Sequence, residues 1–255
     1  MIVLYAESFA PWCEKARWAL DHHRVHYSYR EHVPLFGEIT LRMATRRLLP
    51  RATIPLLITE SDVLMDSFGI ARYAERRGSG STLFPDAHEA EIHSWNACSE
   101  VIMTHGRSML LPRLSRMPDA LREQLPTPIP RWLRGAFTPI ASFGVEYLKY
   151  KYQITVDDAR HERASREALG RLRLALADGR DYILGHSFSF ADIAMATSLQ
   201  FVKPVAGNFI ELGPATRVAW TNGDMARDYP DLLQWRDRLY ELLRRRCSRS
   251  SAQTG

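Results

Sequence analysis

The sequence predicts a chain in two parts, an α/β unit with the element order β-α-β-α-β-β-α followed by an all-helical region. Over roughly the first 80 residues, short apolar segments alternate with segments of helical periodicity. Beyond that point helical periodicity prevails. A run rich in glycine, serine and proline, 78–89, separates the two parts and is typical of a linker.

The α/β unit begins with an apolar strand at 2–5. A helix then opens at Pro11, because proline suits the first position of a helix. Val25, Tyr27 and Tyr29 alternate on one face, which indicates a second strand. Since a helix carries the chain back between these two strands, we expect them to be parallel.

The rest of this unit consists of a helix at 38–49, two short strands and a closing helix. The strands at 56–59 and 63–65 are joined by a tight turn and are therefore expected to be antiparallel. The closing helix begins near Ser67 and is expected to stop at Gly78, because glycine is typical of helix ends.

Four segments beyond the linker have the periodicity and composition of helices: 89–111, 157–178, 187–202 and 229–246. Ser189 and Asp192 form a variant of the capping box at the start of the third segment. Pro230 fits the first helical position of the last one. The basic end of that helix, 242–250, is expected to be solvated and frayed.

These elements predict a division of the chain into four segments. They are an α/β domain at 1–79, a linker at 80–88, a helical domain at 89–247 and a disordered tail at 248–255. Within the helical domain, the proline-dense stretch 125–132 is not expected to be helical.

The composition is that of an ordinary globular protein, with 45% hydrophobic and 25% charged residues. The formal net charge of +5 is spread along the chain, so we expect no nucleic-acid partner. No apolar run approaches the roughly 20 residues of a membrane span and no signal peptide is apparent, so no membrane partner is expected. The cysteines Cys13, Cys98 and Cys247 are odd in number and far apart, which favours reduced thiols and a cytoplasmic location.

The segment 8–20, SFAPWCEKARWAL, reads like a redox motif that lacks one residue. Cys13 stands where a Cys-x-x-Cys motif carries its second cysteine, and Ala10 stands in place of the first, nucleophilic one. Because Pro11 suits the first helical position, Ala10 is the expected N-cap. Alanine has no side-chain acceptor for the first-turn N–H groups, so an anionic group suits that place.

Taken together, five sequence elements resemble the soluble glutathione S-transferase superfamily. They are the first strand with SFAPWCEKARWAL, TIPLL at 53–57, MDSFGIARYAE at 65–75, SFSFADI at 187–193 and YPDLLQWRDRLYELL at 229–243. The resemblance implies a thioredoxin-like N-terminal domain and an all-helical C-terminal domain. It also implies a cytoplasmic, homodimeric detoxification enzyme that uses glutathione as co-substrate and needs no metal. The chain is longer than is usual for this family, and the segment 111–152 is interpreted as the additional part.

For glutathione, the resemblance implies a cis peptide bond before Pro55. The backbone of Ile54 would then pair with the cysteinyl unit like an added strand. From the residues alone, Pro55 could equally begin an edge strand. Asp66 and Ser67 stand at a helix N-terminus, which suits the γ-glutamyl amine and carboxylate, or equally an ordinary N-cap pair.

The remaining contacts are assigned from residue type. The glycyl carboxylate of glutathione needs a cation, for which Arg42 and Arg51 are the candidates. The electrophilic co-substrate also needs a pocket, called here the acceptor pocket. We assign it to Met103, Arg107, Trp132 and Tyr147, and we expect the stretch 125–132 to cover it as a lid.

A glutathione transferase must hold the glutathione thiol as a thiolate near pH 7, although the ordinary pKa of a thiol is about 8.5. Relatives use a Tyr, Ser or Cys near the first helix, and Ala10 departs from the Ser and Cys patterns. Three candidates remain: the hydroxyl of Ser8, the thiol of Cys13 and the backbone N–H groups of the first helical turn.

The resemblance therefore implies an enzyme that conjugates glutathione to a small, mostly apolar electrophile. Two alternatives stay open. One is a glutathione-dependent thiol transferase or reductase that uses Cys13 as its nucleophile. The other is a non-catalytic, transferase-like binding module, which Ala10 keeps in consideration.

Overall fold

The structure, a computed structural model, describes residues 1–32, 37, 41, 53–125, 129–130 and 132–245. Its chain forms two compact units. Unit 1 comprises Met1–Ala97, Ala175–Thr197 and the described residues from 234 onward, and unit 2 comprises Cys98–Leu174 and Ser198–Leu233. The predicted helix at 38–49 and the predicted tail at 248–255 fall mostly or wholly outside the described residues. The predicted domain boundaries stay a prediction.

Unit 1 contains a four-stranded sheet with the order β2-β1-β3-β4. The strands are β1 (Val3–Ala6), β2 (Ser28–Glu31), β3 (Leu56–Ile58) and β4 (Val63–Leu64). β1 pairs with β2 in parallel, whereas β3 is antiparallel to both β1 and β4. The predicted directions of the first and last strand pairs are therefore confirmed.

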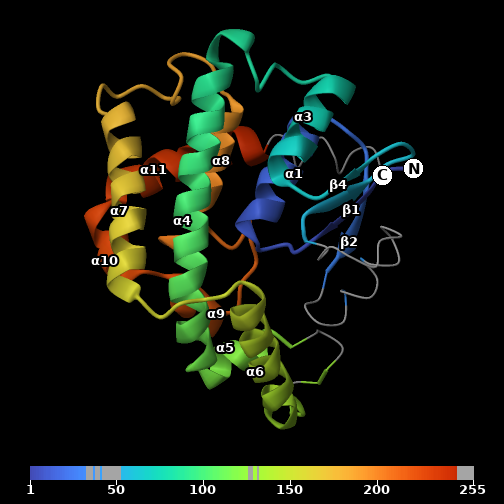
Figure 1. The fold of residues 1–255 in the computed structure, drawn as a ribbon, viewed down its shortest axis with the longest axis vertical. Coiled ribbons are helices and arrows are strands. Elements are labelled where there is room, and N and C mark those ends of the chain that lie inside the picture. Colours follow the sequence, from blue (N-terminus) through green and yellow to red (C-terminus); the bar gives the residue numbers. More distant parts are fainter. Residues whose placement is uncertain (33–36, 38–40, 42–52, 126–128, 131, 246–255) are drawn as a thin grey trace. The chain divides into compact units, whose positions relative to one another are not determined.

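Two helices pack together on one side of this sheet, α1 (Pro11–His22) and α3 (Ser67–Arg77) (Figure 1). α1 begins at the predicted proline, and α3 ends at Gly78 as expected. The second strand begins later than predicted, at Ser28. Arg24 adopts a left-handed φ of 55° in the turn just after α1, and residues 25–27 have no regular secondary structure.

The predicted helical segments beyond the linker are confirmed. They are α4 (Glu89–Ser115), α7 (Asp158–Ala175), α8 (Phe190–Ser198) and α11 (Pro230–Leu239). Further helices are α5 (Pro118–Glu123), α6 (Arg134–Lys151), α9 (Pro214–Trp220) and α10 (Gly223–Asp228), besides 3-10 turns η1 (Asp86–His88) and η2 (Leu199–Phe201) and a π-helical turn η3 (Tyr240–Arg244). None of the helices that the structure describes is long and apolar enough to cross a membrane.

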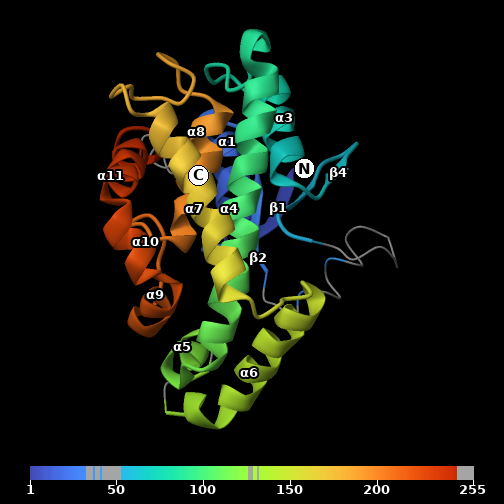
Figure 2. The same ribbon diagram turned by 60° about the vertical axis from the view of Figure 1, so that its left-hand side comes forward.

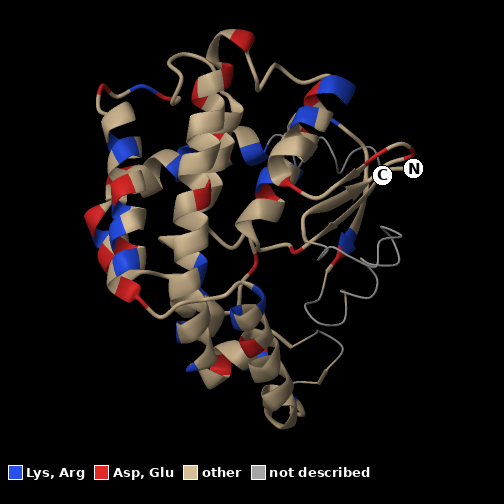
Figure 3. Cartoon of the chain, viewed as in Figure 1, with Lys and Arg blue, Asp and Glu red and all other residues tan. Residues whose placement is uncertain are grey.

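In unit 2, α4 and α7 run side by side in two views of the molecule (Figures 1 and 2). The Cys98 thiol of α4 lies 3.8 Å from the carbonyl oxygen of Ala168 in α7. Acidic and basic residues alternate along α7 (Figure 3). Arg166, for example, pairs with both Glu162 and Asp228. This alternation agrees with the spread of charge along the sequence.

Asp192 caps α8 from inside the core of unit 1. Its carboxylate accepts hydrogen bonds from the N–H of Ile183 at 2.8 Å and from the N–H and hydroxyl of Ser189 at 2.8 and 2.9 Å. The predicted capping pair thus forms, with the serine hydroxyl donating to the carboxylate. Burial raises the pKa of Asp192 to about 6, although the donated hydrogen bonds oppose that rise.

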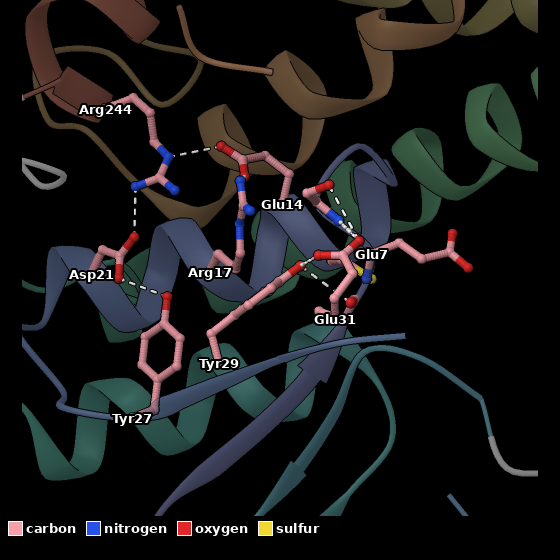
Figure 4. Close-up of polar contacts among 11 residues, drawn as sticks. Glu7, Glu14, Arg17, Asp21, Tyr27, Tyr29, Glu31 and Arg244 are labelled. Carbon is pink, nitrogen blue, oxygen red and sulfur yellow. Dashed lines mark hydrogen bonds and ion pairs between the residues drawn. The ribbon is translucent and has the colours of Figure 1, made fainter. Parts of the chain in front are cut away.

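A buried ion network ties the C-terminal turn η3 to α1. Arg244 donates to Glu14 Oε1 and to Asp21 Oδ2, both at 2.7 Å. Arg17 Nε donates to Glu14 Oε2 at 3.0 Å, and the Tyr27 hydroxyl donates to Asp21 Oδ1 at 2.9 Å (Figure 4). Burial alone would raise the pKa of Glu14, but Arg17 and Arg244 hold it below its ordinary value.

The network corrects, at Arg244, the expectation that the basic segment 242–250 is solvated and frayed; residues 246–250 lie outside the described residues. Arg244 is only 6% exposed, whereas its neighbour Arg245 forms an exposed pair with Glu241. The reason is that Glu14 and Asp21 offer two buried carboxylates seven residues apart on α1, and only a cation can compensate them.

We expect Arg244→Met to lower the free energy of unfolding by roughly 3–5 kcal/mol, because it leaves buried Asp21 without a cation and Glu14 with Arg17 alone. The matched control is Arg245→Met, which removes a half-exposed pair and should cost at most about 1 kcal/mol. Urea unfolding followed by circular dichroism measures both. Equal losses for the two variants would contradict the assigned role of Arg244.

Asp192 should make stability depend on pH. Its pKa in the folded protein, about 6, lies above its ordinary value of 3.8, so the folded state binds more protons between these pH values. The stability it contributes is present below about pH 4 and is lost as the pH rises through about 6. Relative to Asp192→Asn, the free energy of unfolding of the wild type should fall by roughly 3 kcal/mol over that interval. Urea titrations of both proteins across it test this, and a constant difference would contradict it.

Candidate functional site

The first turn of α1 lies just after the end of β1 in unit 1. Ala10 is the N-cap, with φ −75° and ψ 127°, and its side chain makes no capping hydrogen bond. Pro11 is the first helical residue, and the N–H of Glu14 donates to the Ala10 carbonyl at 2.9 Å. The predicted N-cap is therefore confirmed. The positive end of the α1 dipole faces this turn without a side-chain anion from the cap residue.

Cys13, one of the two side-chain candidates for thiol chemistry, is fully buried. Its sulfur accepts a hydrogen bond from the Glu7 N–H at 3.4 Å. Burial raises the pKa of the Cys13 thiol, and the Glu7 carboxylate raises it further. These surroundings favour the protonated thiol, which is a poor nucleophile.

Ser8, the other candidate, is exposed and bound to a carboxylate. Its N–H donates to Glu31 Oε1 at 3.1 Å, and its hydroxyl donates to the same oxygen at 3.3 Å. The parallel register explains this contact, because Ala6 at the end of β1 lies opposite Glu31 at the end of β2. The chain that leaves β1 therefore passes the Glu31 side chain.

Tyr29 completes this group from the same strand. Its hydroxyl donates to Glu31 Oε2 at 2.6 Å and lies 3.1 Å from the Ala6 carbonyl oxygen (Figure 4). Burial raises the pKa of Tyr29, and its hydrogen bond to Glu31 adds to that rise. The Arg17 guanidinium lies 5.9 Å from the centre of the Tyr29 ring. Sequence reasoning missed Glu31 and Tyr29 as site residues, since only the strand register brings them to Ser8.

The second part of the candidate site lies at the start of β3. The Ile54–Pro55 peptide bond is cis, as expected. The Thr53 hydroxyl donates to the Met65 carbonyl oxygen at 3.3 Å. This hydrogen bond holds the segment before Pro55 beside the segment that leads to Asp66, so the structure brings together two of the predicted glutathione-binding elements.

The third part is the N-terminus of α3. Asp66 is the N-cap, and its carboxylate accepts the N–H of Gly69 at 2.7 Å. A Cβ atom on residue 69 would come within 2.7 Å of that carboxylate, so glycine permits the close approach. Ser67 is the first helical residue and is only 5% exposed. Asp66 is thus an N-cap, as one of the two interpretations predicted, and its carboxylate binds the backbone of the first helical turn.

The other predicted site residues lie elsewhere. Arg42 and Arg51 are outside the described residues. The predicted acceptor residues Met103, Arg107, Trp132 and Tyr147 all belong to unit 2. Met103 is fully buried and Trp132 is 81% exposed. The Arg107 guanidinium stacks 3.6 Å from the centre of the Tyr152 ring, and Tyr147 lies 6.0 Å from the Lys151 ammonium. Across the described part of the chain, no group of three or more His, Cys, Asp or Glu could hold a metal.

Comparison with known proteins relates both parts of the chain to one family. Residues 9–77 match the family model "Glutathione S-transferase, N-terminal domain" and residues 158–238 match "Glutathione S-transferase, C-terminal domain". No curated protein sequence matches the chain.

Solved structures share the fold at low sequence identity. A glutathione S-transferase from Methylobacillus flagellatus with glutathione bound is 16% identical, with a TM-score of 0.62 over 94% of this chain and 95% of that one. One from Methylobacterium radiotolerans, in complex with glutathione sulfonate, is 18% identical, with a TM-score of 0.60 over 94% and 90%. Glutathione transferase F2 from Populus trichocarpa is 14% identical, with a TM-score of 0.60 over the whole of both chains.

The fold of unit 1, its cis-proline, the capped start of α3 and the two domain matches agree with one another. The chain therefore belongs to the glutathione S-transferase superfamily.

Proposed function

We propose that this protein is a glutathione transferase that conjugates glutathione to a small, mostly apolar electrophile. The observation that carries the proposal is the first turn of α1, where a helix begins behind an N-cap without a side-chain acceptor. Family membership and two relatives that hold glutathione or its sulfonate support glutathione as the ligand. The cytoplasmic location and the homodimeric state belong to the same proposal.

The sulfur of glutathione would lie at this first turn. The backbone N–H groups there and the helix dipole favour a negative charge without a side-chain hydroxyl. The buried thiol of Cys13 is a weaker candidate for direct participation, because its surroundings raise its pKa. The Ser8 hydroxyl is also weaker as a donor, because it already donates to Glu31.

The rest of glutathione would lie along β3 and α3. The backbone of Ile54 would pair with the cysteinyl unit in the manner of an added strand. The γ-glutamyl carboxylate would lie against the N-terminus of α3, where Ser67 is the first residue. Arg42 and Arg51 remain the proposed partners of the glycyl carboxylate, and the four acceptor residues of unit 2 remain proposed contacts of the electrophile.

One specific observation favours a second candidate function. A carboxylate, that of Glu31, lies at the hydroxyl that would otherwise support a thiolate. This arrangement suits a module that binds glutathione or its conjugates without catalysing their formation. By contrast, the buried Cys13 argues against the thiol transferase alternative.

Ser67→Ala should raise the Kd for glutathione about tenfold, because a hydrogen bond to a charged group contributes about 1.5 kcal/mol. Isothermal titration calorimetry measures the affinity. Ser61→Ala, in the exposed β3–β4 turn, is the matched control and should bind as the wild type does. Unchanged binding in Ser67→Ala would remove Ser67 from the proposed site, and no binding by the wild type would refute the proposed function.

Cys13→Ala should leave the rate of glutathione conjugation to a chloronitrobenzene within about twofold of the wild type, because the proposed mechanism makes no use of a thiolate at residue 13. The same variant is assayed for reduction of a mixed disulfide with glutathione. Loss of a wild-type disulfide-reducing activity on this substitution would favour the thiol transferase alternative instead.

A further inference from the structure

Glu31 is the acceptor of three hydrogen bonds beside the first turn of α1. Two come from the N–H and hydroxyl of Ser8 at 3.1 and 3.3 Å, and the third comes from the Tyr29 hydroxyl at 2.6 Å. Both carboxylate oxygens are engaged, so the group is held in a fixed orientation at the end of β2. A negative charge therefore has a defined place beside Ser8, two residues before the N-cap Ala10.

The orientation of Ser8 follows from this contact. A serine hydroxyl has one proton and two lone pairs, and here the proton is directed at Glu31. Toward any other atom, Ser8 Oγ then presents lone pairs. It can accept a hydrogen bond from a thiol, but it cannot donate one to a thiolate while it donates to Glu31.

The pKa of Cys13 shows how the charges around the segment between β1 and α1 act on a sulfur atom. The pKa of its thiol is raised chiefly by burial and next by the Glu7 carboxylate, and Glu31 also raises it. The Glu7 N–H and Arg17 act in the opposite direction but do not prevail. A sulfur atom that is already present beside this segment is therefore kept protonated in part by the nearby carboxylates.

We propose that Glu31 sets the sulfur preference of the glutathione site. Through its own charge and through its hold on the Ser8 proton, it weakens the preference of the first turn of α1 for an anionic sulfur relative to a neutral one, as in the thiol of glutathione or the thioether of a glutathione conjugate. This inference rests on the proposed function, because that function places the glutathione sulfur at the first turn of α1. Glu31 is thus a positioning residue that restrains conjugation at neutral pH.

The binding test compares two ligands that differ in charge at sulfur. S-methylglutathione is neutral there, whereas glutathione sulfonate carries a permanent negative charge. By isothermal titration calorimetry, Glu31→Gln should bind the sulfonate about tenfold more tightly than the wild type does, because a negative charge beside the segment that leads into α1 is removed. Its affinity for S-methylglutathione should stay within about twofold.

Two controls separate the role of Glu31 from general effects. Glu60→Gln removes the same charge from an exposed side chain that pairs with the N-terminal amine, and it should change neither affinity. Ser8→Ala keeps the charge of Glu31, so it should not raise the affinity for the sulfonate. Equal changes for both ligands in Glu31→Gln, or no change, would overturn the inference while leaving the proposed function intact.

A second readout follows the thiol itself. The ultraviolet absorbance of the bound thiolate, titrated with pH, should show that the pKa of bound glutathione is about one unit lower in Glu31→Gln than in the wild type. The kcat/KM for conjugation at neutral pH should rise accordingly. An unchanged or higher thiol pKa in this variant would overturn the inference. If the wild type binds none of the three ligands, the proposed function fails and the inference fails with it.

Discussion

Two carboxylates of α1, those of Glu14 and Asp21, are buried, and cations of the same unit must compensate their charge. Arg244 supplies one guanidinium to both, and Arg17 supplies a second to Glu14. The position of α1 in unit 1, and with it the first turn that forms the candidate site, depends on this compensation, because an unpaired charge in that place would cost several kcal/mol. The network links the site to the turn η3, far away in the sequence.

Most elements were predictable because their residues show a clear pattern over enough positions. The start of α1 at Pro11 and the end of α3 at Gly78 follow from proline and glycine chemistry that acts locally. The helices α9 and α10 were missed, because segments of 7 and 6 residues are too short to display helical periodicity. Arg244 was misjudged, because its burial depends on carboxylates far away in the sequence.

The candidate site was predictable where one short motif carries it. The cis bond before Pro55 was implied by the family resemblance and the cap formed by Asp66 by its neighbours in sequence, and the structure has both. The pairing of Ser8 with Glu31 could not be predicted from a short motif, because it depends on the register between two parallel strands. Likewise, the state of the Cys13 thiol depends on burial and on carboxylates that surround it in space.

The contact between Glu14 and Arg244 joins residues 230 positions apart. During synthesis on the ribosome, α1 emerges well before Arg244, and over that delay Asp21 has no cation and Glu14 has only Arg17. At the usual 5–20 residues per second, that delay lasts roughly 10–50 s. In that interval water has to solvate the carboxylate of Asp21, so the buried network of α1 is incomplete in the nascent chain. The ion network around α1 is therefore completed only after Arg244 has been synthesised.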